Sequence, residues 1–349
     1  MSKLTRKGIM LAVTGIFLST TLLTGCGGGD KKAAAPAAGG ADKKIVIKCG
    51  TEAAASHPES KGAQKLAELV KAKSNGSIEI QVFDSAKLGS MKERCEGMRM
   101  GTVDMGTSSA GFLASYVPVM GLFDLPYVYK DKAHEFRVFD GDIGKQIDKK
   151  MQEKGFRAIC YFDMGSRQVT NNVKPINTLD DLKNMKIRTP QTDASIQGFK
   201  ALGAAPTPMA FSEVYMALQQ KVVDGQENPL SIIMSNKFYE VQKYLSMTNH
   251  QLFIQVLSMS EKTWKKLSPN QQKILMECAK EAQAYEREIA AKEESELVAT
   301  LKGKGMQVNE IKDLKPFMEA CKSLRQTYIQ KIGKDAEEMF KAIDALRDK

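Results

Sequence analysis

Two arginines, Arg188 and Arg167, stand where short apolar runs give way to loops. In "NMKIRTPQTDAS" (184–195), apolar and basic residues alternate up to Arg188, as in a strand that enters a core. Pro190 then ends ladder pairing, so Arg188 marks the end of that strand. A guanidinium there can bind a carboxylate through two parallel N–H···O bonds, which fix both orientation and charge. For Arg188, and for Arg167 in "GSRQVTNN" (165–172), a surface ion pair is the alternative.

Motifs of catalysis are incomplete in this chain. "HEFRV" (134–138) begins like a zinc-protease motif, but Val138 stands where the second histidine is required. "GTSSAG" (106–111) begins like a nucleophile elbow, but Ala110 replaces its second glycine. The sequence therefore offers no positive support for catalysis or a cofactor, and an exported enzyme acting on small acids stays an alternative.

The cysteines also lack a metal-binding pattern. The six cysteines are widely spaced, and no C-x-x-C pair occurs. Without Cys26 an odd number remains, so we predict neither a zinc site nor a dense disulfide framework.

The first 43 residues have the composition of an export signal and a tether. Basic residues precede the apolar run 8–23, which ends in "LTGC" and so resembles the bacterial lipobox. This resemblance implies a lipoprotein signal peptide over 1–25 and a lipid on Cys26; a plain secretory signal with a chance cysteine is the alternative. Residues 26–43 are rich in Gly, Ala and Pro and are predicted to form a flexible tether.

The rest of the chain predicts an α/β fold. Strand and helix patterns alternate along the N-terminal half, which favours a largely parallel sheet. A second series follows, ending in a stretch where Ser212 is expected to cap a helix that carries Val214, Tyr215 and Leu218 inward. The first series comprises 44–52, 59–74, 77–84, 91–101 and 103–109, and the second 156–164, 185–190, 193–203 and 206–229.

One predicted helix, 268–305, is long enough to connect two lobes. Ser268 as N-cap, Pro269 in the first turn and Gln271 three residues on form a capping-box pattern. No breaker precedes Gly303, so the helix would extend roughly 50 Å at 1.5 Å per residue.

The charge pattern argues against nucleic-acid binding. The 349 residues carry a net charge of +10, but lysines alternate with acids and no basic run is interleaved with aromatic residues. Solvated faces account for this distribution.

The stretch 206–250 resembles the solute receptors of tripartite ATP-independent periplasmic (TRAP) transporters, the DctP family. "GSRQVTNN", "LKNMKIRTP" and "LGAAPTPM" fit the same family in the expected order, and "KLGSMKERCEGMRMGTVDM" (87–105) fits its N-terminal lobe. The resemblance implies a two-lobe periplasmic solute-binding fold with a ligand cleft between the lobes. It places 44–164 plus 252–293 in lobe I and 165–251 plus 294–349 in lobe II. It also implies a monomeric receptor that delivers a carboxylate-containing solute to a membrane permease and touches the membrane only through its lipid.

The resemblance also implies site residues. Arg188 corresponds to the carboxylate clamp and Arg167 to a second site arginine. Each of three other residues has an alternative role: Phe211 could belong to the core, His57 could cap a helix, and Asn228 could form a turn. The full predicted set is Arg188, Arg167, Asn228, Phe211, Gln191, His57, Glu227 and Ser108.

The implied solute is a sugar acid or a C4-dicarboxylate. Within 206–250 the likeness is to sialic-acid receptors, but those receptors carry a glutamate near Ser108 and Ser109, and asparagines near His57 and Gln191. The carboxylate anchor is kept while the rest of the pocket differs, which favours a uronate, another sugar acid or a C4-dicarboxylate over sialic acid. A lipid-anchored sensor with a receptor-like fold is a further alternative.

Overall fold

The structure is a computed structural model that describes residues 42–349. The predicted signal peptide, Cys26 with its predicted lipid, and most of the predicted tether lie outside the described residues. Within this range, one nine-stranded sheet forms the centre of the molecule. Its strands are β1 (Ile45–Gly50), β2 (Ile78–Phe83), β3 (Met105–Ser109), β4 (Phe156–Asn171), β5 (Lys186–Thr189), β6 (Ala205–Pro208), β7 (Gly225–Pro229), β8 (Tyr244–Ser260) and β9 (Gln307–Glu310).

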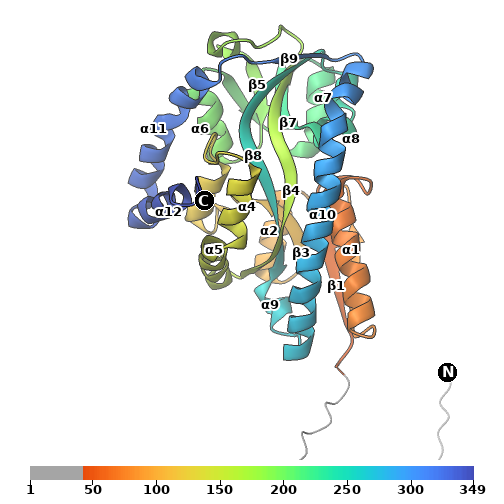
Figure 1. Ribbon diagram of the computed structural model, residues 1–349. Coiled ribbons are helices and arrows are strands. Elements are labelled where there is room, and N and C mark those ends of the chain that lie inside the picture. Colours follow the sequence, from red (N-terminus) through yellow and green to blue (C-terminus); the bar gives the residue numbers. More distant parts are fainter. Residues whose placement is uncertain (1–41) are drawn as a thin grey trace, which may run out of the picture. The chain divides into compact units, whose positions relative to one another are not determined.

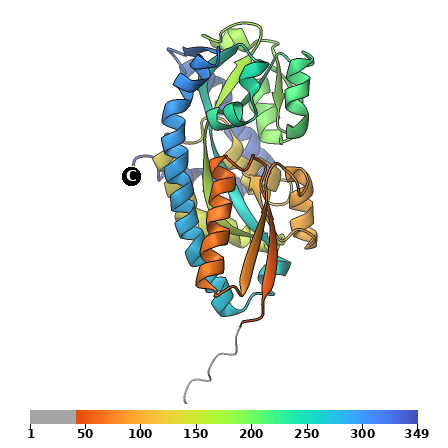
Figure 2. The same ribbon diagram turned by 90° about the vertical axis from the view of Figure 1, so that its right-hand side faces the viewer.

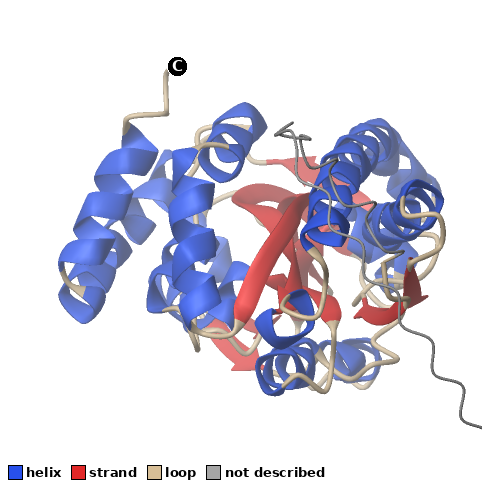
Figure 3. Ribbon diagram, turned by 90° about the horizontal axis from the view of Figure 1, so that it is seen from below, coloured by secondary structure: helices blue, strands red, loops and turns tan. Residues whose placement is uncertain are grey.

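Helices cover both faces of the sheet, as Figure 3 shows from below. The α-helices are α1 (Pro58–Lys73), α2 (Met91–Met100), α3 (Ala110–Leu113), α4 (Lys132–Asp140), α5 (Asp142–Glu153), α6 (Asp193–Ala201), α7 (Val214–Gln219), α8 (Leu230–Ser235), α9 (Glu261–Trp264), α10 (Pro269–Gly303), α11 (Lys315–Ile332) and α12 (Lys334–Asp344). Short 3₁₀ helices are η1 (Pro118–Asp124), η2 (Leu179–Leu182), η3 (Phe211–Glu213) and η4 (Phe238–Glu240). Within residues 42–349 no helix combines the length and apolarity that a membrane span requires.

The strand order is β2-β1-β3-β8-β4-β7-β5-β6, with β9 paired to β8. The expected parallel pairing is present at both ends, where β1 pairs with β2 and β3, and β5 pairs with β6 and β7. The centre differs from that expectation because β4 and β8 are long antiparallel neighbours, each continuing through both halves of the sheet. A strand that crosses from one lobe to the other and a strand that returns must run in opposite directions.

The two lobes are joined by β4, β8 and the long helix α10 (Figures 1 and 2). One end of α10 packs on α1, and the other end contacts α8 and β9. The predicted capping box is present: Ser268 Oγ accepts from Gln271 N at 3.1 Å, and Gln271 Oε1 accepts from Ser268 N at 3.0 Å. The sequence expectation of a bridging helix is therefore confirmed.

The helix expected to begin at Ser212 differs in its cap. A 3₁₀ turn precedes α7, and Glu213 Oε2 accepts from Ala210 N at 3.0 Å, so the cap of this turn comes from Glu213. Ser212 is exposed and caps nothing. Val214 and Leu218 are buried as expected, while Tyr215 is only partly buried, and its hydroxyl donates to Glu240 Oε2 at 2.9 Å.

The apolar cores follow this division. One core lies between α1, β1–β3 and the first half of α10, and another lies among α7, α8 and the end of α10. A third core, on the opposite face, combines η1, α4, α5 and α6 with the C-terminal helices α11 and α12. The C-terminal helices thus pack against elements of both lobes, and the exact lobe boundaries given above stay a prediction.

Candidate functional site

A cavity that is partly open to solvent lies where the two lobes meet, and the space between its walls, open solvent included, is about 720 Å³. Lobe I contributes residues of α1, α2, β3 and η1 to its wall, and lobe II contributes residues of β4, β5, η3 and β7. Phe211, Phe253 and Met164 supply apolar wall, and several charged side chains supply polar wall.

Arg188 lies on β5 and places a charged group on the wall of the cavity. Its side chain is only 3% exposed, and Nε and Nη2 donate to the carbonyl of Met209 at 3.2 and 2.8 Å. The Phe211 ring centroid lies 5.8 Å from the guanidinium carbon. Burial lowers the pKa of Arg188 to about 10, which still leaves it a cation at neutral pH. No carboxylate among residues 42–349 lies within 4.0 Å of it.

Arg167 differs from Arg188 because its charge is already paired. It lies on β4 beside a bulge, and its Nε and Nη2 bind the two carboxylate oxygens of Glu227 at 2.5 and 2.8 Å. Nη2 also donates to Asn228 Oδ1 at 3.2 Å, and the guanidinium stacks 4.4 Å from the centroid of Phe253. Arg167 therefore orients the amide of Asn228 as well as contributing to the cavity wall.

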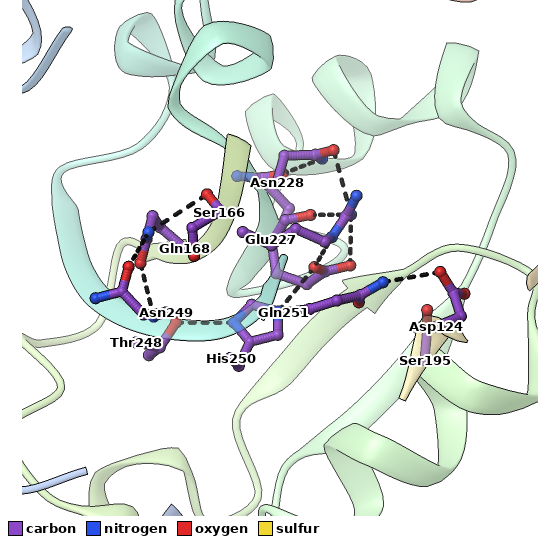
Figure 4. Close-up of polar contacts among 12 residues, drawn as sticks. Asp124, Ser166, Gln168, Ser195, Glu227, Asn228, Thr248, Asn249, His250 and Gln251 are labelled. Carbon is purple, nitrogen blue, oxygen red and sulfur yellow. Dashed lines mark hydrogen bonds and ion pairs between the residues drawn. The ribbon is translucent and has the colours of Figure 1, made fainter. Parts of the chain in front are cut away.

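Glu227 connects Arg167 to a buried histidine, His250, and Figure 4 shows the contact between Glu227 and His250. His250 Nε2 lies 3.0 Å from Glu227 Oε2, and its Nδ1 lies 2.8 Å from Thr248 Oγ1. Burial alone would raise the pKa of Glu227, but Arg167 and the His250 hydrogen bond outweigh it and lower the pKa to about 2. Burial lowers the pKa of His250, so the neutral ring donates from Nε2 and accepts the Thr248 hydroxyl at Nδ1.

Five of the eight sequence-predicted residues line the cavity in this structure: Arg188, Arg167, Asn228, Phe211 and Gln191. They come from four separate segments, which the fold brings to one place. Gln191 is exposed, and Phe211 is half-buried. Their contacts with a solute remain predictions.

The other three predicted residues lie behind the wall. Glu227 is held by Arg167. His57 caps α1, where its Nδ1 accepts from Glu59 N at 3.1 Å, which matches the capping alternative. Ser108 is fully buried with its hydroxyl 3.1 Å from Cys95 Sγ, while its neighbour Ser109 lines the cavity. Direct solute contacts of these three residues have no support in this arrangement.

Sequence reasoning missed three acids on the wall, Asp124, Glu59 and Glu52. Asp124 accepts from Gln251 Nε2 at 2.8 Å (Figure 4), and it also accepts from Thr192 Oγ1 at 3.3 Å. Burial raises the pKa of Asp124, and the charge of Arg167 opposes that rise. The signal that could have identified Asp124 is an acid inside the otherwise apolar run "GLFDLPY" (121–127).

The part of the chain that the structure describes contains neither a group of metal ligands nor a disulfide. Residues 42–349 contain no group of His, Cys, Asp or Glu arranged to hold a metal ion. The five cysteines in this range are buried and free. The cavity therefore offers guanidinium, carboxylate, amide and aromatic groups, which suit reversible binding of a polar anion.

Comparison with known proteins agrees with this arrangement. The family model described as bacterial extracellular solute-binding protein, family 7 (DctP), matches residues 49–331. The sialic acid-binding periplasmic protein of Vibrio cholerae is 36% identical over 288 residues, covering 82% of this chain and 89% of that protein. The 2,3-diketo-L-gulonate-binding periplasmic protein of Escherichia coli is 32% identical over 302 residues, covering 86% and 92%.

A solved structure shares the fold. The crystal structure of a TRAP periplasmic solute-binding protein from Polaromonas, bound to D-erythronate, superposes with a TM-score of 0.84 at 34% identity. The match covers 88% of this chain and all of the Polaromonas chain. Because the family model and these relatives match most of its length, the chain belongs to the DctP family of bacterial extracellular solute-binding proteins, the receptors of TRAP transporters.

Proposed function

We propose that this chain captures a carboxylate-containing solute, a sugar acid or a C4-dicarboxylate, outside the cytoplasm and delivers it to a TRAP permease. The observation that carries the proposal is Arg188, a buried guanidinium on the cavity wall with no carboxylate partner among residues 42–349. The named solutes of the three relatives, sialic acid, 2,3-diketo-L-gulonate and D-erythronate, are all carboxylates that also carry hydroxyl groups.

The geometry explains why an anion would bind at Arg188. The fold already holds this guanidinium away from bulk water, and the Met209 carbonyl uses only Nε and Nη2. A solute carboxylate would supply the missing countercharge through a charge-assisted hydrogen bond, which is stronger than one between neutral groups. Asn228, held by Arg167, and Phe211 would orient the rest of the solute.

Binding would favour the closed arrangement of the lobes because both lobes contribute wall residues. Only a difference in affinity between open and closed states can shift that population. The strands β4 and β8 connect the lobes, and β4 carries register shifts at Asp163/Ser166 and Arg167/Val169. These irregular positions would absorb the bending, with α10 as the second connection.

The receptor role predicts binding without turnover and attachment at the membrane surface. A receptor returns its solute chemically unchanged, whereas an exported enzyme would convert it. The lipid on Cys26, the tether 26–43 and the monomeric state follow from the sequence resemblance and belong to this proposal.

A thermal-shift screen followed by calorimetry tests the proposal. The panel contains D-glucuronate, D-gluconate, sialic acid and succinate, with D-glucose as the uncharged control. A solute at 100 times its dissociation constant stabilises the protein by about 2.7 kcal/mol. We expect a shift with at least one acid and none with glucose, and mass spectrometry should recover that acid unchanged. The absence of a shift with every carboxylate would refute the proposal.

A further inference from the structure

Some charged side chains of the cavity wall have an ion-pair partner among residues 42–349, and others have none. Arg167 is paired with Glu227, and Glu52 is paired with Arg94 at 2.7 Å, so these charges are internally balanced. Lys92 is exposed, so water screens its charge. One buried cation and two buried acids remain without an ion-pair partner among residues 42–349: Arg188, Glu59 and Asp124.

Glu59 presents an unused acceptor. Its side chain is fully buried on the cavity wall, and Oε2 accepts from Ala53 N at 3.0 Å. Among residues 42–349 no donor meets Oε1 in full hydrogen-bond geometry, and the Thr107 side chain lies beside the carboxylate. Buried carboxylate oxygens are normally satisfied, so this oxygen is the expected partner of a donor that arrives with the solute.

Asp124 presents a second acceptor, and the fold makes room for it. A carboxylate has about four lone-pair sites, and Gln251 and Thr192 occupy two of them. A Cβ at Gly111 would lie 2.0 Å from Asp124 Oδ2, so a residue without a side chain is needed at that position. The carboxylate is thus held in place by its neighbours while part of its hydrogen-bonding capacity stays free.

The cavity is therefore asymmetric. The arginines come from β4 and β5 of lobe II, whereas the two acids come from α1 and η1 of lobe I. Gln255 lines the same lobe I wall, and its Oε1 also lacks a partner. A hydroxyl group can donate to each of these oxygens, but a second carboxylate would meet acids of its own charge.

From this asymmetry, and resting on the proposed function, we infer that Glu59 and Asp124 form a hydroxyl-binding wall that selects monocarboxylic polyhydroxy acids against dicarboxylates. The single uncompensated guanidinium of Arg188 binds one carboxylate. The hydroxyls of the solute then donate to the wall, so the substrate class is that of aldonates and similar monoacids.

Matched acid pairs test this inference by calorimetry. D-gluconate and D-glucarate, D-galactonate and galactarate, and D-erythronate and meso-tartrate each differ only in a terminal CH₂OH or carboxylate. Like charges brought together at a binding site cost several kcal/mol, and about 2 kcal/mol corresponds to a 30-fold change in affinity. For the pair that binds most tightly, we expect the monoacid to be favoured at least about 30-fold.

The variants Glu59→Gln and Asp124→Asn keep the shape of each side chain and remove its charge. Each should reduce the monoacid preference at least about tenfold, chiefly by strengthening dicarboxylate binding. Glu288→Gln, an exposed position on α10 away from the cavity, is the matched control and should leave the ratio unchanged. The two variants are independent, so one that fails to fold leaves the other as the test.

The outcomes separate this inference from the receptor function. Equal affinities within the pairs, or an unchanged ratio in the folded variants, would overturn the hydroxyl-binding wall while tight dicarboxylate binding still supported a carboxylate receptor. If no member of any pair binds while another acid of the screen does, the wall is refuted and the carboxylate-receptor function stands; if no acid of the screen or of the pairs binds, both are refuted.

Discussion

Replacing Arg188 with alanine should weaken solute binding at least about 30-fold. The guanidinium is 3% exposed before any solute arrives, so its desolvation is already part of the fold. Its pKa of about 10 keeps it charged at neutral pH. Removing one partner of a desolvated charge pair costs about 2–5 kcal/mol, which corresponds to roughly 30-fold to several thousand-fold in affinity. The loss should appear as faster dissociation, because Arg188 acts after encounter.

A lysine at this position tests the geometry as well as the charge. Arg188→Lys keeps a cation but loses the fork that can donate to Met209 and to a carboxylate simultaneously. We expect binding between that of the wild type and that of Arg188→Ala. Calorimetry with the acid identified by the screen measures both variants, and thermal denaturation checks that they fold.

Arg99→Ala is the control for loss of a positive charge, since Arg99 is exposed and does not line the cavity. It should bind the solute like the wild type. Unchanged affinity of a folded Arg188→Ala variant would show that the carboxylate is held elsewhere and would refute the assignment of Arg188 as the anchor.

Three further predictions concern stability and location. Ser268→Ala removes the capping box of α10 and should destabilise the protein by about 1 kcal/mol, which lowers Tm by a few degrees. Ser295→Ala, at an exposed position of the same helix, should leave Tm unchanged. Burial lowers the pKa of His57 to about 3. The unfolded chain therefore binds a proton below about pH 6.5 that the folded protein excludes. The free energy of unfolding should fall by up to about 5 kcal/mol as the pH drops from 6.5 towards 3. His57→Asn, which keeps a capping oxygen, should flatten this pH dependence in denaturant titrations, and equal slopes would contradict it. Cys26→Ser should move the protein from the membrane fraction to the soluble fraction of expressing cells, whereas Cys321→Ser, at a buried free thiol, should not.

Much of the fold could be predicted from local patterns because the rules involved are local. Alternation placed β1, β2 and β5 within one or two residues, and the Ser268–Gln271 pattern placed the start of α10. The central antiparallel pair β4 and β8 was not predicted, because its direction depends on how two lobes share strands. The cap of α7 was wrong because Glu213 reaches Ala210 and leaves Ser212 in solvent.

For the site, the sequence by itself predicted where Arg188 lies, since the alternating pattern that contains it stops at Pro190, which cannot continue ladder pairing. It also determined the family, through a long ordered resemblance. Only the tertiary structure decided which charges are compensated: Arg167 meets Glu227 from a strand sixty residues later, while the hydrogen bonds of the Arg188 side chain within residues 42–349 go to a backbone carbonyl. The two wall acids without an ion-pair partner among residues 42–349, Glu59 and Asp124, became evident in the same way. Charge compensation depends on distances between segments far apart in the chain, which local patterns do not contain.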